Sequence, residues 1–425
     1  MKAQRTLPPS AAPIDWRDLI QGLVGLVRPQ TTIRQREAEF REYFGVKHVW
    51  FVSSGKAALS LILQALHGLS GRQKVVVPGY TCFSVPSAVV RAQLSVALCD
   101  VDPLSFDFDF DQLTQMTDST VLCVLATHLL GIGVDVPRIV KFCGQRGIFV
   151  VEDVAQAFGG DREGRPFGTM GDVAFLSFGR GKNITCGSGG AIFSNDDRIG
   201  EAITREYAQL PEESVLGMLK NWLEVAATQL LINPSRYWLP AGLPFLKLGE
   251  TKFYTDFPVT RMDPVRAGLL RRWKERLARA TASRVAHAEQ VLRSLGSSPV
   301  QTIKPSGRDH SVYLRLPLLM RSKQEKEALC RVSVEQGLGV SSMYPSSVQY
   351  IAELREKLSS QDVPQSTMIA ERLVTLPTHE LLSARDLARI CSAVQDVQRA
   401  EGVGTTCSPE VREGQRRVSE RPRVS

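Results

Sequence analysis

The chain has 425 residues, of which 43% are hydrophobic and 23% charged, and its net charge at neutral pH is +8. This length accommodates two domains with cores of their own, and the composition is ordinary for a soluble globular protein. The N-terminus lacks the apolar core of a signal peptide, and no apolar run approaches the ~20 residues that span a bilayer. We therefore expect a cytoplasmic protein and exclude a membrane-spanning one.

The excess of positive charge is diffuse except for one basic run between Arg261 and Arg284. Without interleaved aromatic residues, this run predicts a solvated helix face or the rim of a site for an anionic substrate, and not a nucleic-acid groove. The eight cysteines form no CxxC pair and no cluster with histidines. Several lie in apolar strands, which favours reduced, buried thiols over disulfides or a metal site.

The N-terminal part begins with residues 1–15, whose prolines suggest a loose arm, and continues with two helices expected over 15–26 and 32–44. A short strand at 49–52 then leads through the turn Ser53–Lys56 into a helix at 57–66. A strand, a small-residue turn and a helix N-terminus form the geometry that holds an anion on backbone amides. The turn differs from a P-loop, because Trp50 and Ala57 occupy positions that require glycine and a hydroxyl residue.

Short apolar runs then alternate with helical patterns along the chain. Strands are predicted at 74–78, 95–99, 121–126, 148–152, 173–178 and 191–193, and helices at 84–92 and 136–146. Continuous apolar strands of this kind predict an α/β domain with a largely parallel sheet covered by helices on both faces. Ligands of such sheets bind beyond the carboxyl ends of the strands, so Gly55, Asp153 and Lys182, each just after a strand, are expected to converge.

The pattern changes after residue 201. An amphipathic helix is predicted at 214–231, followed at 233–246 by an aromatic and proline-rich hairpin, for which burial in a subunit interface is favoured over a membrane surface. A long helix at 264–295 leads into an α+β region with strands at 312–316 and 338–341 and helices at 323–336 and 384–398. We thus expect an arm and lead-in helix (1–30), a large domain (31–263) with an insertion (205–250), a small C-terminal domain (264–400) and a disordered tail (401–425).

The glycine-rich stretch from Ser177 to Phe193 lies between two apolar strands and carries one lysine, Lys182. A lysine held there suits Schiff-base chemistry with a carbonyl group, although glycine-flanked lysines are common in ordinary loops. Asp153 ends an otherwise apolar strand, where a lone carboxylate needs a partner such as a protonated pyridine nitrogen; a helix N-cap is the alternative. Ser177 could donate its hydroxyl to a phosphate.

Taken together, the motifs resemble those of the DegT/DnrJ/StrS sugar aminotransferases, a branch of the fold-type-I pyridoxal-phosphate enzymes. The resemblance extends from about residue 32 to 397, and its motifs include Glu-Asp-x-Ala-Gln-Ala at 152–157, Ser-Phe-x-x-x-Lys at 177–182 and Gly-x-Gly-Gly at 187–190. It implies the fold-type-I architecture, with a large cofactor domain and a smaller α+β domain.

The resemblance also implies roles for individual residues. Lys182 would form the Schiff base with the cofactor, Asp153 would contact the pyridine nitrogen, and Gln156 would lie near the ring oxygen. Further positions are expected in contact with the cofactor (Ser54, Gly55, Lys56, Tyr80, Cys82 and Ser177) or with the substrate (His128, Arg180, Tyr344 and His379).

The chain departs from the family pattern at three places. Lys56 replaces a threonine of the phosphate turn, and Cys82 replaces an aromatic residue that usually stacks on the cofactor, leaving Tyr80 or Phe83 as substitutes. The segment Val259–Met262 lacks the asparagine that in this family reaches the phosphate of the neighbouring subunit. These departures indicate an atypical subgroup and leave the substrate open.

The sequence thus predicts a homodimeric, pyridoxal-phosphate-dependent transaminase that moves an amino group from a donor such as glutamate to a keto-sugar, plausibly nucleotide-linked. The retained Lys182 argues against the dehydratases of the family, which carry histidine there. Two alternatives stay open. One is a different pyridoxal-phosphate reaction on an amino acid or a cyclitol. The other is a non-catalytic or membrane-associated scaffold of a polysaccharide pathway.

Overall fold

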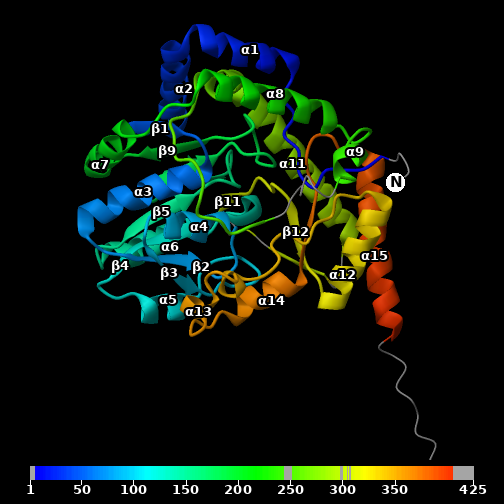
Figure 1. Cartoon of the computed structure of the whole chain (residues 1–425). Helices are drawn as coiled ribbons and strands as arrows, with labels where there is room; N and C mark the ends of the chain where they lie inside the picture. The colour runs from blue at the N-terminus through cyan, green and yellow to red at the C-terminus, as the bar shows by residue number, and fades with distance from the viewer. Residues whose placement is uncertain (1–4, 244–250, 297–299, 304, 306–307, 405–425) are drawn as a thin grey trace, which may run out of the picture.

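The structure, a computed structural model, describes residues 5–243, 251–296, 300–303, 305 and 308–404, without the side chains of 401–404 (Figure 1). Within this part, the largest sheet has seven strands in the order β1-β9-β8-β5-β4-β2-β3. Only β9 runs against its neighbours, which confirms the predicted mostly parallel sheet. The strands are β1 (His48–Val52), β2 (Lys74–Pro78), β3 (Ser95–Cys99), β4 (Val121–Thr127), β5 (Phe149–Asp153), β8 (Val173–Ser177) and β9 (Gly190–Ser194).

Helices cover both faces of this sheet, because successive strand residues point to opposite sides. In β1, Val49 and Phe51 belong to one core cluster, and Trp50 and Val52 belong to the other. The first cluster includes residues of α2 (Pro29–Phe44), α5 (Phe110–Met116), α6 (Val136–Gly144) and α11 (Trp273–Leu295). The second includes residues of α3 (Gly55–Ser70), α4 (Ser84–Arg91) and α7 (Asp197–Ala208).

A third core cluster lies in the C-terminal part of the chain, which Figure 1 shows beside the large sheet. The helix α11 links the two regions, since Trp273 packs in the large core and Val291 in the C-terminal one. The C-terminal elements are β10 (Gln301–Thr302), β12 (Leu316–Leu319), β13 (Leu373–Leu376), α12 (Lys323–Gln336), α13 (Arg355–Leu358), α14 (Pro364–Arg372) and α15 (Ala384–Gly404). A small sheet of β11 (Asp309–His310), β6 (Asp161–Arg162) and β7 (Arg165–Pro166) joins the two regions, and the boundary at residue 264 stays a prediction.

The N-terminal arm is ordered, contrary to the prediction of a loose segment. Leu7 is 1% exposed and packs in the C-terminal core. The Ala11 carbonyl accepts a hydrogen bond from the buried Arg284 guanidinium, and the Ser10 hydroxyl donates to the Gly181 carbonyl at 3.0 Å. The arm therefore follows a groove across both regions before α1 (Trp16–Val27) begins, because its backbone polar groups have partners along the way.

The predicted helix at 264–295 is two helices, α10 (Pro264–Leu269) and α11. The interruption occurs where the buried Arg36 donates hydrogen bonds to the carbonyls of Leu270 and Arg271. A side chain from α2 therefore replaces the helical amides as the partner of these carbonyls, which ends the first helix without a glycine or a proline.

Two predicted C-terminal strands are also wrong in their bounds. The strand expected at 312–316 begins only at Leu316, because Tyr313 has a left-handed backbone with φ +45 and the Val312 amide bonds to the Gly131 carbonyl. The strand expected at 338–341 is reduced to one bridge between Ser341 and Thr375, since Gly339 also has a positive φ.

The insertion contains α8 (Val215–Leu231) and α9 (Trp238–Ala241), so part of the predicted hairpin is helical. The remainder, residues 244–250, and the predicted tail from residue 405 onward lie outside the described residues, and α15 extends to Gly404. Among the described helices, not one combines the length and apolarity needed to cross a bilayer.

Candidate active site

Three segments that follow strands meet at one edge of the large sheet. The turn Ser53–Ser54 follows β1, Asp153 ends β5, and Ser177 ends β8. The loop from β8 to β9 carries Lys182. Because β1, β8 and β5 point the same way and lie close together in the strand order, their carboxyl ends converge as predicted.

The turn after β1 forms a tight cradle at the N-terminus of α3. Ser54 is the N-cap, and its hydroxyl accepts a hydrogen bond from the Ala57 amide at 3.1 Å. A Cβ added to Gly55 would lie 2.8 Å from the Ser177 Cβ, and one added to Gly190 would lie 2.5 Å from the Ser54 carbonyl oxygen. Only glycine allows these approaches, which leaves the first-turn amides of α3 and the Ser177 hydroxyl beside one another.

Asp153 is 6% exposed, and burial raises the pKa of its carboxyl group. Its Oδ1 atom accepts a hydrogen bond from the Ala155 amide at 2.9 Å, and the charge of Lys182 partly offsets the effect of burial on the pKa. The described part of the chain offers Asp153 no ion-pair partner within 4 Å. A buried carboxylate in this state is stabilised by a cationic group that comes from outside the chain.

Lys182 lies in the same buried region, where desolvation lowers the pKa of its amine. The charges of Cys82 and Asp153 act to raise this pKa, and that of Arg315 acts to lower it. Gly181, with φ +78, shapes the loop that presents the lysine, and the arm residue Ser10 holds the Gly181 carbonyl. A lowered pKa increases the fraction of unprotonated amine, the form that acts as a nucleophile or a base.

Gln156 connects this region to two tyrosines. Its Nε2 atom donates to the Tyr344 hydroxyl at 2.8 Å, and its Oε1 atom accepts from the Leu130 amide. Tyr344 packs against Tyr80 with ring centroids 5.3 Å apart, and both residues are at most 2% exposed. The three residues form a buried layer beside Asp153 and Lys182.

A cavity of about 140 Å³ joins eight of the residues that the sequence predicted or implied. They are Ser54, Gly55, Lys56, Cys82, Asp153, Gln156, Ser177 and Lys182. Leu59, Ser84, Val85, Ala155 and Phe175 also line it, and the sequence did not identify them. Their only signal was their position next to the predicted residues, at strand ends or helix starts.

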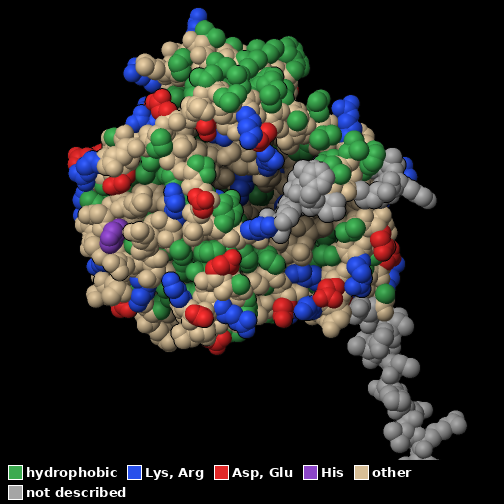
Figure 2. Space-filling view, viewed as in Figure 1, with side chains coloured by type: hydrophobic (Ala, Val, Ile, Leu, Met, Phe, Trp, Pro, Cys, Tyr) green, Lys and Arg blue, Asp and Glu red, His purple; other side chains and the backbone are tan. Residues whose placement is uncertain are grey.

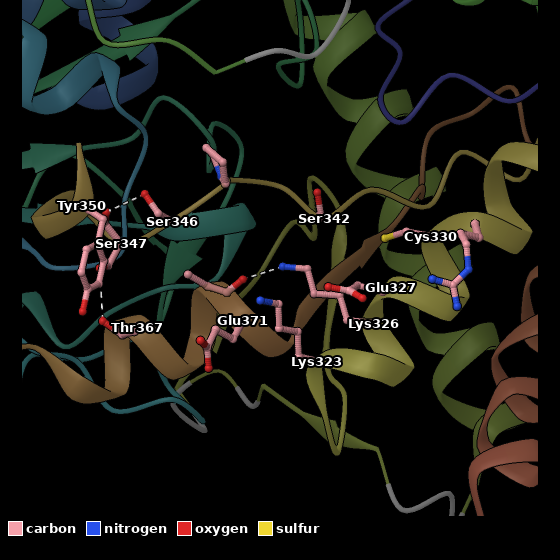
Figure 3. Close-up of a pocket in the computed structure, with 13 residues that line it drawn as sticks. Lys323, Lys326, Glu327, Cys330, Ser342, Ser346, Ser347, Tyr350, Thr367 and Glu371 are labelled. Carbon is pink, nitrogen blue, oxygen red and sulfur yellow. Dashed lines mark hydrogen bonds between the residues drawn. The ribbon is translucent and has the colours of Figure 1, made fainter. Parts of the chain in front are cut away.

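A larger cavity of about 610 Å³ lies between α12, α14 and the loop before residue 350 (Figure 3). It contains Lys323, Glu327 and Glu371, and Figure 3 shows Lys326 directed toward α14, where its ammonium donates to the Ala370 carbonyl. No residue predicted for the site lines this cavity. Its mixed charges lack the convergent nucleophile and acid found at Lys182, so the smaller cavity is the better candidate for chemistry.

Lys56 does not direct its ammonium toward the cradle. The Nζ atom lies 3.3 Å from the ring centroid of Tyr254 and 4.6 Å from that of Phe257. These rings belong to the segment that precedes Val259–Met262, in which the Met262 amide bonds to the Phe51 carbonyl. Only the backbone amide of Lys56 therefore belongs to the cradle, and its charge is used in cation–π contacts.

His128 is 0% exposed, and both of its ring nitrogens have partners. The Nδ1 atom accepts from the Val134 amide, which assigns the proton to Nε2, and Nε2 donates to Glu152 at 3.2 Å. The ring also stacks on Phe167 with centroids 4.2 Å apart. His128 thus orients the strand end after β4 and β5 and leaves no ring nitrogen for a substrate.

The other predicted substrate residues lie in different surroundings. Arg180 is exposed and pairs with Glu224 of α8 at 3.3 Å. His379 is 1% exposed, and its Nε2 atom donates to the Pro8 carbonyl of the arm at 2.9 Å. Of the four, Tyr344 is the one in direct contact with a residue of the Lys182 cavity.

The basic run does not form a rim of free charges. Arg266, Arg276 and Arg284 are at most 8% exposed and bind an acid or backbone carbonyls, so the predicted solvated face is wrong for them. Four others pair with carboxylates on the surface, and these are Arg271, Arg272, Lys274 and Arg279. The seven described cysteines are all free thiols, and the described residues contain no cluster suited to a metal ion.

Comparison with known proteins identifies the arrangement. A family model described as the DegT/DnrJ/EryC1/StrS aminotransferase family matches residues 25–223 and 249–395. The chain is 26% identical over 370 residues to GDP-perosamine synthase of Caulobacter vibrioides, covering 85% of this chain and 88% of that protein. It is 30% identical to GDP-perosamine synthase of Vibrio cholerae over 45% of this chain, which spans about half (51%) of that relative's length.

Solved structures share the fold at low sequence identity. PseC of Helicobacter pylori, an aminotransferase involved in the biosynthesis of pseudoaminic acid, gives a TM-score of 0.75 at 15% identity over 93% of this chain and 100% of that one. The sugar aminotransferase Spr1654 of Streptococcus pneumoniae, in its PMP form, gives a TM-score of 0.74 at 18% identity over 95% of this chain and 100% of that one.

Proposed function

The chain belongs to the DegT/DnrJ/EryC1/StrS aminotransferase family, and from this premise we propose that it transfers an amino group from an amino acid to a keto-sugar carried on a nucleotide. Enzymes of this family depend on pyridoxal phosphate. The observation that supports the proposal most directly is that Lys182, Asp153 and the N-terminal turn of α3 line one cavity.

The residues present fit this cofactor. The approach of Gly55 to Ser177 leaves backbone amides and a hydroxyl where a phosphate would be held, and a Cβ at Gly55 would fill the space. Buried Asp153 offers the negative charge that a protonated pyridine nitrogen needs, and Gln156 and Cys82 would flank the ring. When bound, the cofactor acts as an electron sink for the carbon that carries the amino group.

The residues of the chain then divide the remaining tasks. Lys182 provides an amine whose pKa burial lowers, so that its Nζ atom can accept a proton from the donor carbon and later return it. Asp153 keeps the proton on the ring nitrogen, and the layer of Gln156, Tyr344 and Tyr80 excludes water from one side. The arm holds the Lys182 loop through Ser10.

The relatives support a sugar nucleotide as acceptor. Besides the GDP-perosamine synthases, they include dTDP-3-amino-3,4,6-trideoxy-alpha-D-glucose transaminase of Micromonospora megalomicea, 25% identical over 86% of this chain. We propose glutamate as the amino donor. One relative favours the alternative of a cyclitol acceptor, because L-glutamine:2-deoxy-scyllo-inosose aminotransferase of Streptomyces kanamyceticus is 31% identical over 38% of this chain.

The test uses the purified full chain and its Lys182→Ala and Asp153→Asn variants. The wild type should carry an absorbing cofactor that borohydride fixes to the peptide containing Lys182, and Lys182→Ala should lose the adduct. Asp153→Asn keeps an oxygen for the Ala155 amide but removes the charge, so we expect cofactor retention with roughly 100-fold slower turnover. Trapping at another lysine, or no cofactor at all, would overturn the proposal.

The substrate class is separated by a second measurement. Glutamate and glutamine are first tested as donors by the change in cofactor absorbance, and GDP-linked and dTDP-linked keto-sugars and a keto-cyclitol are then tested as acceptors. Turnover of the cyclitol alone would favour the alternative activity. Donor reaction without any acceptor turnover would favour another pyridoxal-phosphate reaction on an amino acid, and no donor reaction would favour the scaffold.

We also propose a homodimer that works in the cytoplasm. Figure 2 shows apolar side chains gathered over α1 and α8. In α1 they recur at one face as Trp16, Ile20, Val24 and Val27, and Val27 is 79% exposed. Such a continuous apolar surface is expected to be covered by another surface, for which a second copy is proposed. The free thiols are consistent with a reducing compartment.

A further inference from the structure

Arg315 is a charged residue that the proposed reaction leaves without a task. It is the one charge in the apolar stretch Val312–Leu319 and lies directly before β12. Its side chain is largely buried, yet no carboxylate of the described residues forms an ion pair with it. The hydrogen bond that its guanidinium makes is to the Met343 sulfur at 3.6 Å, and a thioether is a weak acceptor.

The surroundings of Arg315 are phenolic and cationic. The hydroxyl groups of Tyr80, Tyr237 and Tyr344 are the groups whose charges act on it, and the charge of Arg315 in turn acts on Lys182. The hydroxyl proton of Tyr80, a residue 1% exposed, has no acceptor among the described residues. A buried guanidinium and a buried hydroxyl donor without acceptors are costly unless an anion completes them.

The backbone around this position is held in unusual conformations. Three non-glycine residues with positive φ meet here: Leu130 (φ 58), Tyr313 (φ 45) and Met343 (φ 59). Leu130 donates its amide to Gln156, Tyr313 precedes Arg315 by two residues, and Met343 contacts the guanidinium. Left-handed backbone at such residues persists where the surrounding structure fixes it, and it is frequent at ligand sites.

We propose that Arg315, with Tyr80 and Tyr344 beside it, binds a carboxylate group of the substrate next to Lys182. A guanidinium fork matches a planar carboxylate, and hydroxyl donors can complete its oxygen atoms. The phosphate of the cofactor has its own cradle at α3, so this second cationic position is available to another anion. The inference rests on the proposed function and adds a substrate class to it.

Two sources could present the carboxylate. One is the α-carboxylate that an amino-acid donor carries beside its amine, and the other is a carboxyl group on the keto-sugar. Tyr237 from the segment between α8 and α9 lies within electrostatic reach of Arg315, so the insertion would close this position in either case.

The first arm uses the cofactor-loaded enzyme and measures the absorbance change with L-glutamate and with isoglutamine, its α-carboxamide. If the donor is the source, the wild type should prefer glutamate about 10- to 100-fold, and Arg315→Met should remove that preference by weakening glutamate. Arg315→Lys, which keeps the charge without the fork, should lie between the two. The comparison of the two donors needs no variant and holds even if Arg315→Met fails to fold.

The second arm compares a keto-sugar nucleotide with its C6-carboxylate analogue as acceptor. If the acceptor is the source, the wild type should prefer the carboxylate analogue and should react equally with the two donors, and Arg315→Met should raise KM about 10- to 100-fold for the carboxylate analogue alone. Arg331→Met, an exposed arginine of α12 that lines the separate large cavity, is the matched control and should behave as the wild type.

A third measurement does not depend on turnover. The thermal unfolding of wild type, Arg315→Met and Arg331→Met is followed with and without glutarate as the carboxylate probe. Glutarate should raise the midpoint for the wild type and Arg331→Met and leave Arg315→Met unchanged. Equal midpoint shifts in all three proteins, or no preference for a carboxylate in either arm, would overturn the inference. Loss of cofactor or of all amine transfer would instead overturn the proposed function, which the trapping experiment reports separately.

Discussion

Gly55 shows how a single missing side chain creates the cradle at α3. A Cβ there would lie 2.8 Å from the Ser177 Cβ and 3.2 Å from its hydroxyl oxygen. The backbone cannot move away easily, because the Ser54 carbonyl is itself close to Gly190. Steric fit at this point therefore controls both the packing of α3 against β8 and the space for an anion.

The substitution Gly55→Ala should lower the free energy of unfolding by about 1–3 kcal/mol, the usual cost of overpacking a rigid site. It should also weaken cofactor binding, because the methyl group occupies the cradle. The double variant Gly55→Ala with Ser177→Gly removes the clashing side chain, so stability should return but cofactor affinity should not. Urea unfolding and cofactor titration measure the two effects. A stable Gly55→Ala protein with normal cofactor affinity would show that the cradle has no such role.

At the residue scale, the sequence could predict what strand ends determine. Asp153, Ser177 and Lys182 each follow an apolar run, and parallel strands bring such positions together. It could not predict the direction of the Lys56 ammonium or the partners of His128, because these depend on Tyr254 and Glu152 at unrelated distances along the chain. The same holds for Arg315, whose only signal was one charge in an apolar stretch.

At the scale of elements, the N-terminal arm connects both regions to the Lys182 loop. Pro8 accepts from His379, Ser10 donates to Gly181, and Ala11 accepts from Arg284. The prolines of the arm suggested a loose segment, but its hydrogen bonds are to residues hundreds of positions away. Long-range pairing of an extended segment leaves no periodic signal in the sequence, whereas the helices and strands of the large sheet do.

The contact between the arm and His379 predicts a dependence of stability on pH. Burial is the main cause that lowers the pKa of His379, from 6.5 to about 3. The unfolded chain therefore takes up a proton as pH falls through 6.5, and the folded protein does not until about pH 3. The native state loses stability across this window, by about 3 kcal/mol between pH 7 and pH 4 from this group alone.

The variant His379→Gln keeps a donor for the Pro8 carbonyl and removes the titration. The difference in unfolding free energy between wild type and His379→Gln should therefore fall by about 3 kcal/mol from pH 7 to pH 4. His67→Gln, at the C-terminal end of α3, is the control for the loss of a histidine. If the wild type and His379→Gln keep a constant difference across this pH range, the histidine is not held neutral by the arm.

At the scale of the whole molecule, the apolar surface of α1 and α8 has no covering element in the described chain. Helix α1 turns its small residues inward, since a Cβ on Gly25 would collide with the Pro264 carbonyl at 2.1 Å. Its large apolar side chains consequently point outward, beside Leu216 and Leu223 of α8. This inversion makes sense if the outward face is the one that a partner surface buries.

We therefore expect the wild type to behave as a dimer of about 94 kDa, twice the chain mass of 46.9 kDa, in light scattering. Leu216, 79% exposed, contributes about 2 kcal/mol when buried by a partner, so Leu216→Asp should weaken dimerisation at least ~30-fold. Val334→Asp, 81% exposed on α12, is the matched control and should stay dimeric. A monomeric wild type would contradict the dimer; if that monomer then sedimented with anionic lipid vesicles and Leu216→Asp did not, the apolar surface would be a membrane contact, because the same side chains can enter a lipid interface.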